Sequence, residues 1–131
     1  MADINRSSEH PEHQSKTILI VDDDDGIAEF LVTVLVMEDY RALRARDGLQ
    51  AQEMVKTLVP DLFLLDYQLP GINGLDLADH LHAIEALKQI PVLLMSANLP
   101  KHKREKRSIA FIQKPFEVET LLQTIKQLLD E

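Results

Sequence analysis

Five polar side chains in this sequence are of the types needed for phosphoryl-transfer chemistry. They are Asp22, Asp23, Asp66, Ser96 and Lys114. A carboxylate can attack phosphorus and form an acyl phosphate, and cations or hydroxyl groups must then neutralise the charge on the transferred group. We therefore expect Asp66 to be the nucleophile and the three acids to share Mg²⁺, a hard cation that takes oxygen ligands. Ser96 and Lys114 would then contact the phosphoryl oxygens.

Each of these residues follows or ends a short apolar run that is typical of a buried parallel strand. The runs span residues 17–21, 62–65, 91–95 and 108–113, and a weaker alternating run spans 41–45, nearer the edge. Helical segments separate them, and strands that alternate with helices form a parallel sheet covered on both faces. Because all carboxyl ends of such strands lie on one edge of the sheet, the five residues should meet there.

The helices are inferred from apolar periods. Residues 51–58, 77–84 and 118–129 each carry one apolar face. For the first helix, the residues at helical spacing are Ile27, Phe30, Leu31, Val34 and Leu35. We predict that each of these faces packs on the sheet.

The four consecutive aspartates at 22–25 have a simpler explanation as helix caps. An Asp at the N-cap or in the first turn stabilises a helix. This accounts for Asp24 or Asp25. Asp22 and Asp23 instead follow the strand directly, where crowded carboxylates would have raised pKa values unless they share a cation. Taken singly, the serine and the lysine also have simpler explanations, as a strand cap and a solvated loop residue.

Composition limits the class of protein. With 131 residues, 45% of them apolar, the chain suits one domain with a hydrophobic core. It has no cysteine, which excludes disulfides and thiolate chemistry and fits a reducing cytoplasm. No apolar run approaches the roughly 18 residues of a membrane span, and the net charge of −8 argues against general nucleic-acid binding. We predict a flexible tail at 1–16 and a domain at 17–131.

From about residue 17 to 129 the chain resembles the receiver domain of two-component response regulators. The resemblance implies a flavodoxin-like (βα)5 fold, a three-layer α/β sandwich with strand order 2-1-3-4-5. It also implies a cytoplasmic signalling protein that depends on Mg²⁺ and takes a phosphoryl group from a histidine kinase or a histidine phosphotransfer protein. The matching stretches are ILIVDDD (18–24), ARDGLQA (45–51), PDLFLLDYQLPGING (60–74), MSA (95–97) and KPF (114–116).

The resemblance also implies roles for individual residues at matching positions. Asp66 would be the phosphorylation site. Asp23, Asp66 and the backbone carbonyl of Gln68 would bind the metal directly. Asp22 would bind it directly or through water, and Lys114 would bind the phosphate.

A conformational switch is implied as well. Ser96 would move toward the phosphate while Phe111, the aromatic residue three positions before the lysine, turns inward. Phe111 has no hydroxyl, so only packing would hold its inward state. Gln68 and Asn98 would shape the access of the water that hydrolyses the acyl phosphate. The family pattern further predicts a cis peptide bond at Lys114–Pro115.

Residues 96–114 depart from the family pattern, because this span is about one helical turn shorter than usual. Within it, residues 101–107 hold five Lys or Arg, one acid and no apolar residue, so a helix there could not bury an apolar face. We predict a short or irregular fourth helix, and a monomer or weak dimer. The basic segment is either a solvated helix or a docking patch for an acidic partner or nucleic acid. We favour a downstream protein target.

Three functions remain open at this point. The favoured one is a phosphorylation-controlled receiver that modifies only its own Asp66, loses the phosphoryl group by its own hydrolysis, and is not otherwise an enzyme. A phosphatase with an aspartyl-phosphate intermediate usually has a second acid two residues after the nucleophile, where this chain has Gln68. A binding module that keeps the fold but not the switch is suggested by the weakened fourth helix.

Overall fold

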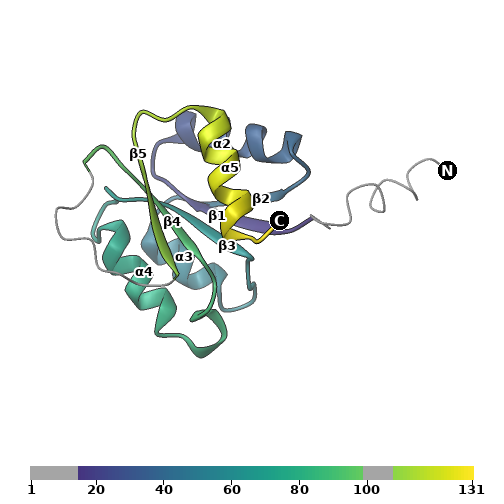
Figure 1. Cartoon of the computed structure of the whole chain (residues 1–131). Helices are drawn as coiled ribbons and strands as arrows, with labels where there is room; N and C mark the ends of the chain where they lie inside the picture. Colours follow the sequence, from purple (N-terminus) through teal and green to yellow (C-terminus); the bar gives the residue numbers. More distant parts are fainter. Residues whose placement is uncertain (1–14, 99–107) are drawn as a thin grey trace.

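The computed structural model describes residues 15–98 and 108–131, which form a layered α/β domain (Figure 1). Within these residues, five parallel strands make one sheet in the order β2-β1-β3-β4-β5. This confirms the predicted fold class and strand order. The strands are β1 (Thr17–Val21), β2 (Arg41–Ala45), β3 (Leu62–Asp66), β4 (Val92–Ser96) and β5 (Ile109–Gln113).

Helices cover both faces of the sheet. The described helices are α2 (Asp25–Met37), α3 (Gly48–Met54), α4 (Gly74–His82) and α5 (Val118–Leu128), with a 3-10 turn, η1, at Glu85–Leu87. In Figure 1, α2 and α5 lie on one face, and α3 and α4 lie on the other. Each face has its own apolar cluster, and the side chains of β1, β3 and β4 alternate between the two. These strands read as continuous apolar runs because they are buried on both sides.

The apolar face predicted for α2 is partly wrong. Its buried residues are Ala28, Leu31 and Leu35, whereas Ile27 is 39% exposed and Phe30 is 51% exposed. The buried residues are three and four positions apart and form one stripe on the sheet side. Ile27 and Phe30 lie beside this stripe, so two large apolar side chains stand exposed near the start of the helix.

The end of the chain contacts the residues before β1 and β2, at the amino ends of the strands. The Tyr40 hydroxyl donates a hydrogen bond to Glu131 Oε1 at 2.9 Å, and Lys16 Nζ lies 3.6 Å from Glu131 Oε2. Burial and the neighbouring Glu131 raise the pKa of Tyr40 above its ordinary value. These contacts tie the chain after α5 to the starts of β1 and β2, and they leave the opposite, carboxyl edge of the sheet for polar side chains.

Some predictions concern segments outside the described residues. These are residues 1–14 of the flexible tail predicted at 1–16, and the basic segment at 101–107 with its predicted short or irregular fourth helix. The domain boundaries also remain predictions. Two helices end earlier than their apolar periods indicated, α3 at Met54 and α4 at His82. Over the ranges that can be described, no helix is long and apolar enough to cross a membrane.

Gly74 lets the start of α4 approach the end of β3. A Cβ atom at this position would lie 2.5 Å from the carbonyl oxygen of Asp66 and 3.0 Å from Tyr67 Cα. Both are backbone atoms that cannot move aside easily. The Gly74 amide also donates a 2.7 Å hydrogen bond to the Tyr67 carbonyl. The absence of a side chain at Gly74 therefore helps to fix Asp66 at the sheet edge.

We expect Gly74→Ala to lower the free energy of unfolding by about 1–3 kcal/mol, the usual cost of forcing extra volume into a packed site. Gly26→Ala in α2 is the matched control, because the nearest group to its Cβ would be Asp24 Oδ1 at 3.4 Å and alanine favours helices. Urea unfolding of both variants measures the difference. Equal stabilities would show that α4 does not press on β3 at Gly74.

Candidate functional site

The strand ends bring the predicted site residues to one edge of the sheet. Asp66 is the last residue of β3, and Asp22 directly follows the neighbouring β1. Ser96 ends β4, and its carbonyl accepts a 2.8 Å hydrogen bond from the amide of Lys114. The sheet therefore places the serine and the lysine together, on the strands that follow the one carrying Asp66.

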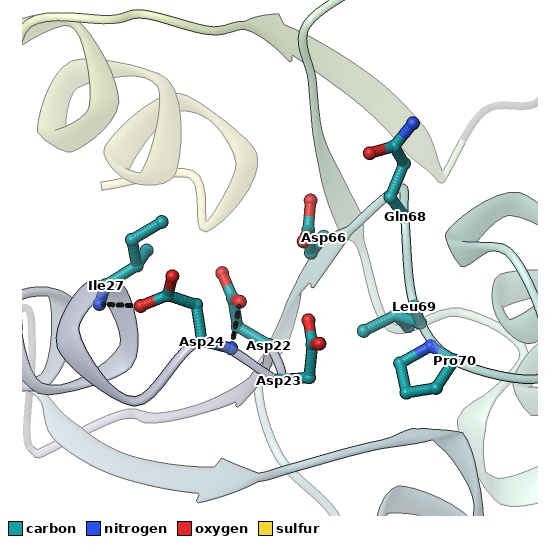
Figure 2. A pocket seen from close by; sticks show the side chains of 8 residues that line it. All are labelled: Asp22, Asp23, Asp24, Ile27, Asp66, Gln68, Leu69 and Pro70. Atoms are coloured by element: carbon teal, nitrogen blue, oxygen red, sulfur yellow. Dashed lines mark hydrogen bonds between the residues drawn. The ribbon is translucent and has the colours of Figure 1, made fainter.

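Three carboxylates form the centre of the site. One oxygen from each of Asp22, Asp23 and Asp66 lies within 4.8 Å of the others, and Figure 2 shows the three groups directed toward a common space. Asp22 is fully buried, Asp66 is nearly so, and Asp23 is exposed. They line one pocket, the acidic pocket, together with Asp24, Ile27, Gln68, Leu69 and Pro70. This spacing suits oxygen ligands around one small cation.

Asp22 has one carboxylate oxygen that is satisfied and one that is not. Oδ1 accepts a 2.9 Å hydrogen bond from the Asp24 amide, but the buried Oδ2 has no hydrogen-bond partner among the described residues. Burial is the main cause that raises the pKa of Asp22 above its ordinary value, and the charge of Asp66 adds to the shift. A buried carboxylate oxygen without a partner is unfavourable unless a cation binds it. The three acids therefore fit a hard divalent metal ion.

Lys114 supplies the counter-charge for Asp66. Its Nζ lies 2.9 Å from Asp66 Oδ1. One ammonium group offsets one of the three negative charges, so two remain, and a divalent cation would balance them. The ammonium group also lies beside the carboxylate that would attack phosphorus, where it can neutralise charge on a transferred group.

Ser96 is buried, and its hydroxyl is part of the turn after β4. Its Oγ donates a hydrogen bond to the Asn98 carbonyl at 2.7 Å and accepts one from the Asn98 amide at 3.3 Å. This is the local capping role that a serine at a strand end often has. The same turn borders a cavity of about 120 Å³ that contains the groups a phosphoryl ion would contact. The cavity is lined by Asp66, Tyr67, Gln68, Ser96, Ala97, Asn98 and Lys114.

The sequence model of one known family covers most of this fold and the whole site. The model describes the response regulator receiver domain, and it matches residues 18–126. The chain belongs to this family. The matched range contains all five residues of the site, which are Asp22, Asp23, Asp66, Ser96 and Lys114.

Known relatives include both longer and similarly short proteins. The phosphate regulon transcriptional regulatory protein PhoB of Pseudomonas aeruginosa is 36% identical over 118 residues, which are 87% of this receiver and 52% of PhoB. The polar-differentiation response regulator DivK of Brucella ovis is 31% identical over 121 residues, which are 89% of this receiver and 98% of DivK. The chain thus spans about half of one relative and nearly all of the other.

A solved structure of a further relative has the same fold. It is the response regulator TrrA from Thermotoga maritima in complex with Mg²⁺-BeF, and it is 30% identical to this receiver. The comparison has a TM-score of 0.73 and covers 86% of this chain and 98% of that one.

The remaining predicted receiver residues lie around this centre. Phe111 on β5 is half-buried and packs against the apolar cluster on the α3 and α4 side. Gln68 is exposed in the loop after β3 and lines both the acidic pocket and the cavity next to Ser96. Asn98 is exposed in the turn after β4. The roles of Phe111, Gln68 and Asn98 stay predictions.

Two local predictions are confirmed. The Lys114–Pro115 peptide bond is cis. Asp24 is the N-cap of α2, and its carboxylate accepts a 2.9 Å hydrogen bond from the Ile27 amide. Of the aspartates at 22–25, Asp24 is therefore a structural cap, and Asp22 and Asp23 belong to the group of three carboxylates, as the sequence indicated.

Sequence reasoning missed Arg44. This residue of β2 lies against the loop that carries the acids, and its Nη1 is 2.8 Å from Asp25 Oδ1. The hydrogen bond and the charge of Arg44 lower the pKa of the exposed Asp25 below its ordinary value. The signal available in the sequence was an arginine one residue before the end of a predicted strand. The carboxyl end of that strand lies on the same sheet edge as the acids.

We expect Asp22→Asn to raise the free energy of unfolding of the metal-free receiver by about 1–3 kcal/mol, because it removes a buried charge with an unsatisfied oxygen. The asparagine carbonyl can still accept the hydrogen bond from the Asp24 amide. Asp23→Asn is the matched control, and its effect should be smaller because that carboxylate is exposed. Urea unfolding in EDTA at pH 7 measures both variants. A loss of stability in Asp22→Asn would contradict this account.

Proposed function

We propose that this receiver accepts a phosphoryl group on Asp66 from the phosphohistidine of a histidine kinase or a histidine phosphotransfer protein. The observation that carries the proposal is the 2.9 Å contact between Lys114 Nζ and Asp66 Oδ1, next to two further carboxylates within 4.8 Å. One sheet edge thus holds a carboxylate that could act as the nucleophile, an ammonium group that balances its charge, and two further carboxylates that could bind a cation. Histidine kinases use ATP, so we propose that the receiver acts in the cytoplasm.

In the proposed transfer, one carboxylate oxygen of Asp66 attacks the phosphorus of phosphohistidine. An O–P bond forms as the N–P bond breaks, and the imidazole leaves with the bonding electron pair. Lys114 then exchanges its contact with the carboxylate for a contact with a phosphoryl oxygen. Ser96 can donate its hydroxyl hydrogen to another phosphoryl oxygen once it leaves the Asn98 carbonyl.

We propose Mg²⁺ as the cation of this site. Asp22, Asp23 and Asp66 would hold it together with the backbone carbonyl of Gln68, and when bound it would neutralise charge on the phosphoryl oxygens. The support is the unpartnered Oδ2 of Asp22 and the two negative charges that Lys114 leaves unbalanced. The Mg²⁺-BeF complex of TrrA, a relative at 30% identity, points the same way.

Phosphorylation would change which downstream protein the receiver binds. The proposed switch couples the movement of Ser96 toward the phosphoryl group to an inward turn of Phe111, which now packs at the edge of an apolar cluster. The receiver would act on no separate substrate, and hydrolysis shaped by Gln68 and Asn98 would end the signal. A module that binds partners without phosphorylation is not favoured, because Lys114 lies against Asp66, the residue proposed as the acceptor.

The phosphohistidine protein would dock on the start of α2. Ile27 lines the acidic pocket, and Phe30 is one helical turn further along, with 51% of its surface exposed. An exposed apolar pair beside a polar site is typical of a protein contact surface. Docking there would bring a histidine on the partner close to Asp66.

We expect acetyl phosphate with Mg²⁺ to add one phosphoryl group to the wild-type receiver and none to Asp66→Asn. EDTA should prevent the addition, because the acids then lack their cation. Asp76→Asn, which changes an aspartate in the first turn of α4, is the control and should react like the wild type. Intact-protein mass spectrometry detects the added group. Equal labelling of Asp66→Asn and the wild type would overturn the proposed acceptor.

We expect Phe30→Ser to slow phosphotransfer from a phosphohistidine protein about tenfold, as for a central apolar contact residue, and to leave labelling by acetyl phosphate unchanged. Val36→Ser is the matched control, because Val36 is on the same helix with a similar exposure of 53% but points to another side. Rapid-quench kinetics with both donors separates docking from chemistry. Slower labelling by acetyl phosphate in Phe30→Ser would show that the substitution disturbs the chemistry at Asp66, and would contradict a role for Phe30 in docking alone.

A further inference from the structure

We propose that Arg44 is a positioning residue of the cation site, which orients the loop carrying Asp22 and Asp23 through a fork of hydrogen bonds to the Asp22 carbonyl. The proposal rests on the cation site of the proposed function. It concerns a residue on β2, outside the three carboxylates and the lysine that would touch the cation or the phosphoryl group.

The guanidinium group of Arg44 spans the loop between β1 and α2. Its Nε and Nη2 donate hydrogen bonds to the Asp22 carbonyl oxygen at 3.0 and 2.8 Å. Its third nitrogen, Nη1, lies 2.8 Å from Asp25 Oδ1, in the first turn of α2. All three nitrogens of one rigid, planar group are therefore engaged, which fixes the orientation of both partners.

The Asp22 carbonyl belongs to the peptide group that leads into Asp23. Holding this oxygen fixes the peptide plane, and the plane contains the Cα atom from which the Asp23 side chain leaves the backbone. On its other side, the Asp22 amide donates a 3.2 Å hydrogen bond to the carbonyl of Ala45, the residue after Arg44. The end of β2 thus holds Asp22 from both sides.

A surface ion pair does not account for this arrangement. Asp25 is largely exposed, and an exposed ion pair contributes little to stability. Arg44 itself is only 22% exposed, and two of its three contacts go to a backbone carbonyl. The contact with Asp25 aligns the guanidinium group, and the fork on Asp22 carries the positioning.

Charge alone makes the opposite prediction. A cation beside an acidic group repels a metal ion, so removal of the charge would strengthen metal binding. Loss of positioning would weaken it, because groups that orient metal ligands typically contribute tenfold or more to metal affinity. The direction of the change in Mg²⁺ affinity therefore separates the two explanations.

Arg46 provides the matched control. It is also basic and lies near the same carboxylate, with Nη2 4.0 Å from Asp25 Oδ1, but its side chain is 65% exposed and it makes no described contact with the Asp22 backbone. Arg46→Gln removes the same charge as Arg44→Gln without removing the fork. Arg44→Lys keeps the charge at position 44 but replaces the planar fork with a single ammonium group.

The test is an Mg²⁺ titration of the full chain followed by amide chemical shifts in NMR spectra, with urea unfolding in EDTA as the measure of fold stability. We expect Arg44→Gln and Arg44→Lys each to bind Mg²⁺ about tenfold more weakly than the wild type, and Arg46→Gln to bind it within about twofold of the wild type or slightly more tightly.

Three results would refute the role of Arg44 while the wild type still binds Mg²⁺. They are tighter binding by Arg44→Gln, wild-type affinity in Arg44→Lys, and lower fold stability with unchanged Mg²⁺ affinity in both variants. A wild-type receiver that does not bind Mg²⁺ would refute the cation site of the proposed function, and the role of Arg44 with it.

Discussion

Repulsion among three carboxylates is the constraint on which the rest of this receiver depends. Asp22, Asp23 and Asp66 present oxygens within 4.8 Å of one another, and in a flexible chain such groups would move apart. Asp66 and Asp22 cannot do so here, because Asp66 ends a hydrogen-bonded central strand and Asp22 is held by the end of β2. The scaffold therefore keeps unfavourable electrostatic energy in place, and a bound cation can release it.

The apolar sheet is what makes this arrangement stable. The side chains of β1 and β3 are almost wholly buried between two apolar clusters, and hydrophobic burial is the largest favourable term in folding. The polar groups of the site lie at the carboxyl edge, where the ends of β1, β3, β4 and β5 meet the start of α2. The free-energy cost of one unsatisfied carboxylate oxygen at that edge is smaller than the stabilisation that burial of the core provides.

Most of the strands could be predicted, because a central parallel strand is apolar on both faces and needs no knowledge of its neighbours. The convergence of Asp66, Ser96 and Lys114 followed from parallel topology alone. The face of α2 was harder, since Ile27 and Phe30 fit the same helical period as residues that are truly buried. The helical period by itself does not distinguish an exposed apolar residue from a buried one.

Contacts between elements were beyond sequence reasoning for a different reason. The fork from Arg44 to Asp22 depends on the register between β2 and β1, which pairs Arg44 with Ile20. The approach of Gly74 to Asp66 likewise depends on how α4 leaves the sheet edge. Neither register nor helix direction is encoded by residue type at one position. The sequence therefore predicts which groups meet at the edge, but not what holds them there.

Lys114 would link the proposed cation to the proposed phosphoryl group. Its ammonium group balances one of three charges while it pairs with Asp66, so the group as a whole retains two. A phosphoryl group on Asp66 would replace one carboxylate charge with about two, and Lys114 would then have to serve the phosphoryl oxygens. The demand for a divalent cation would rise with phosphorylation, and by thermodynamic linkage a bound cation would favour the phosphorylated state to the same extent. Cation binding and phosphorylation at this edge would thus both depend on the same balance of charge.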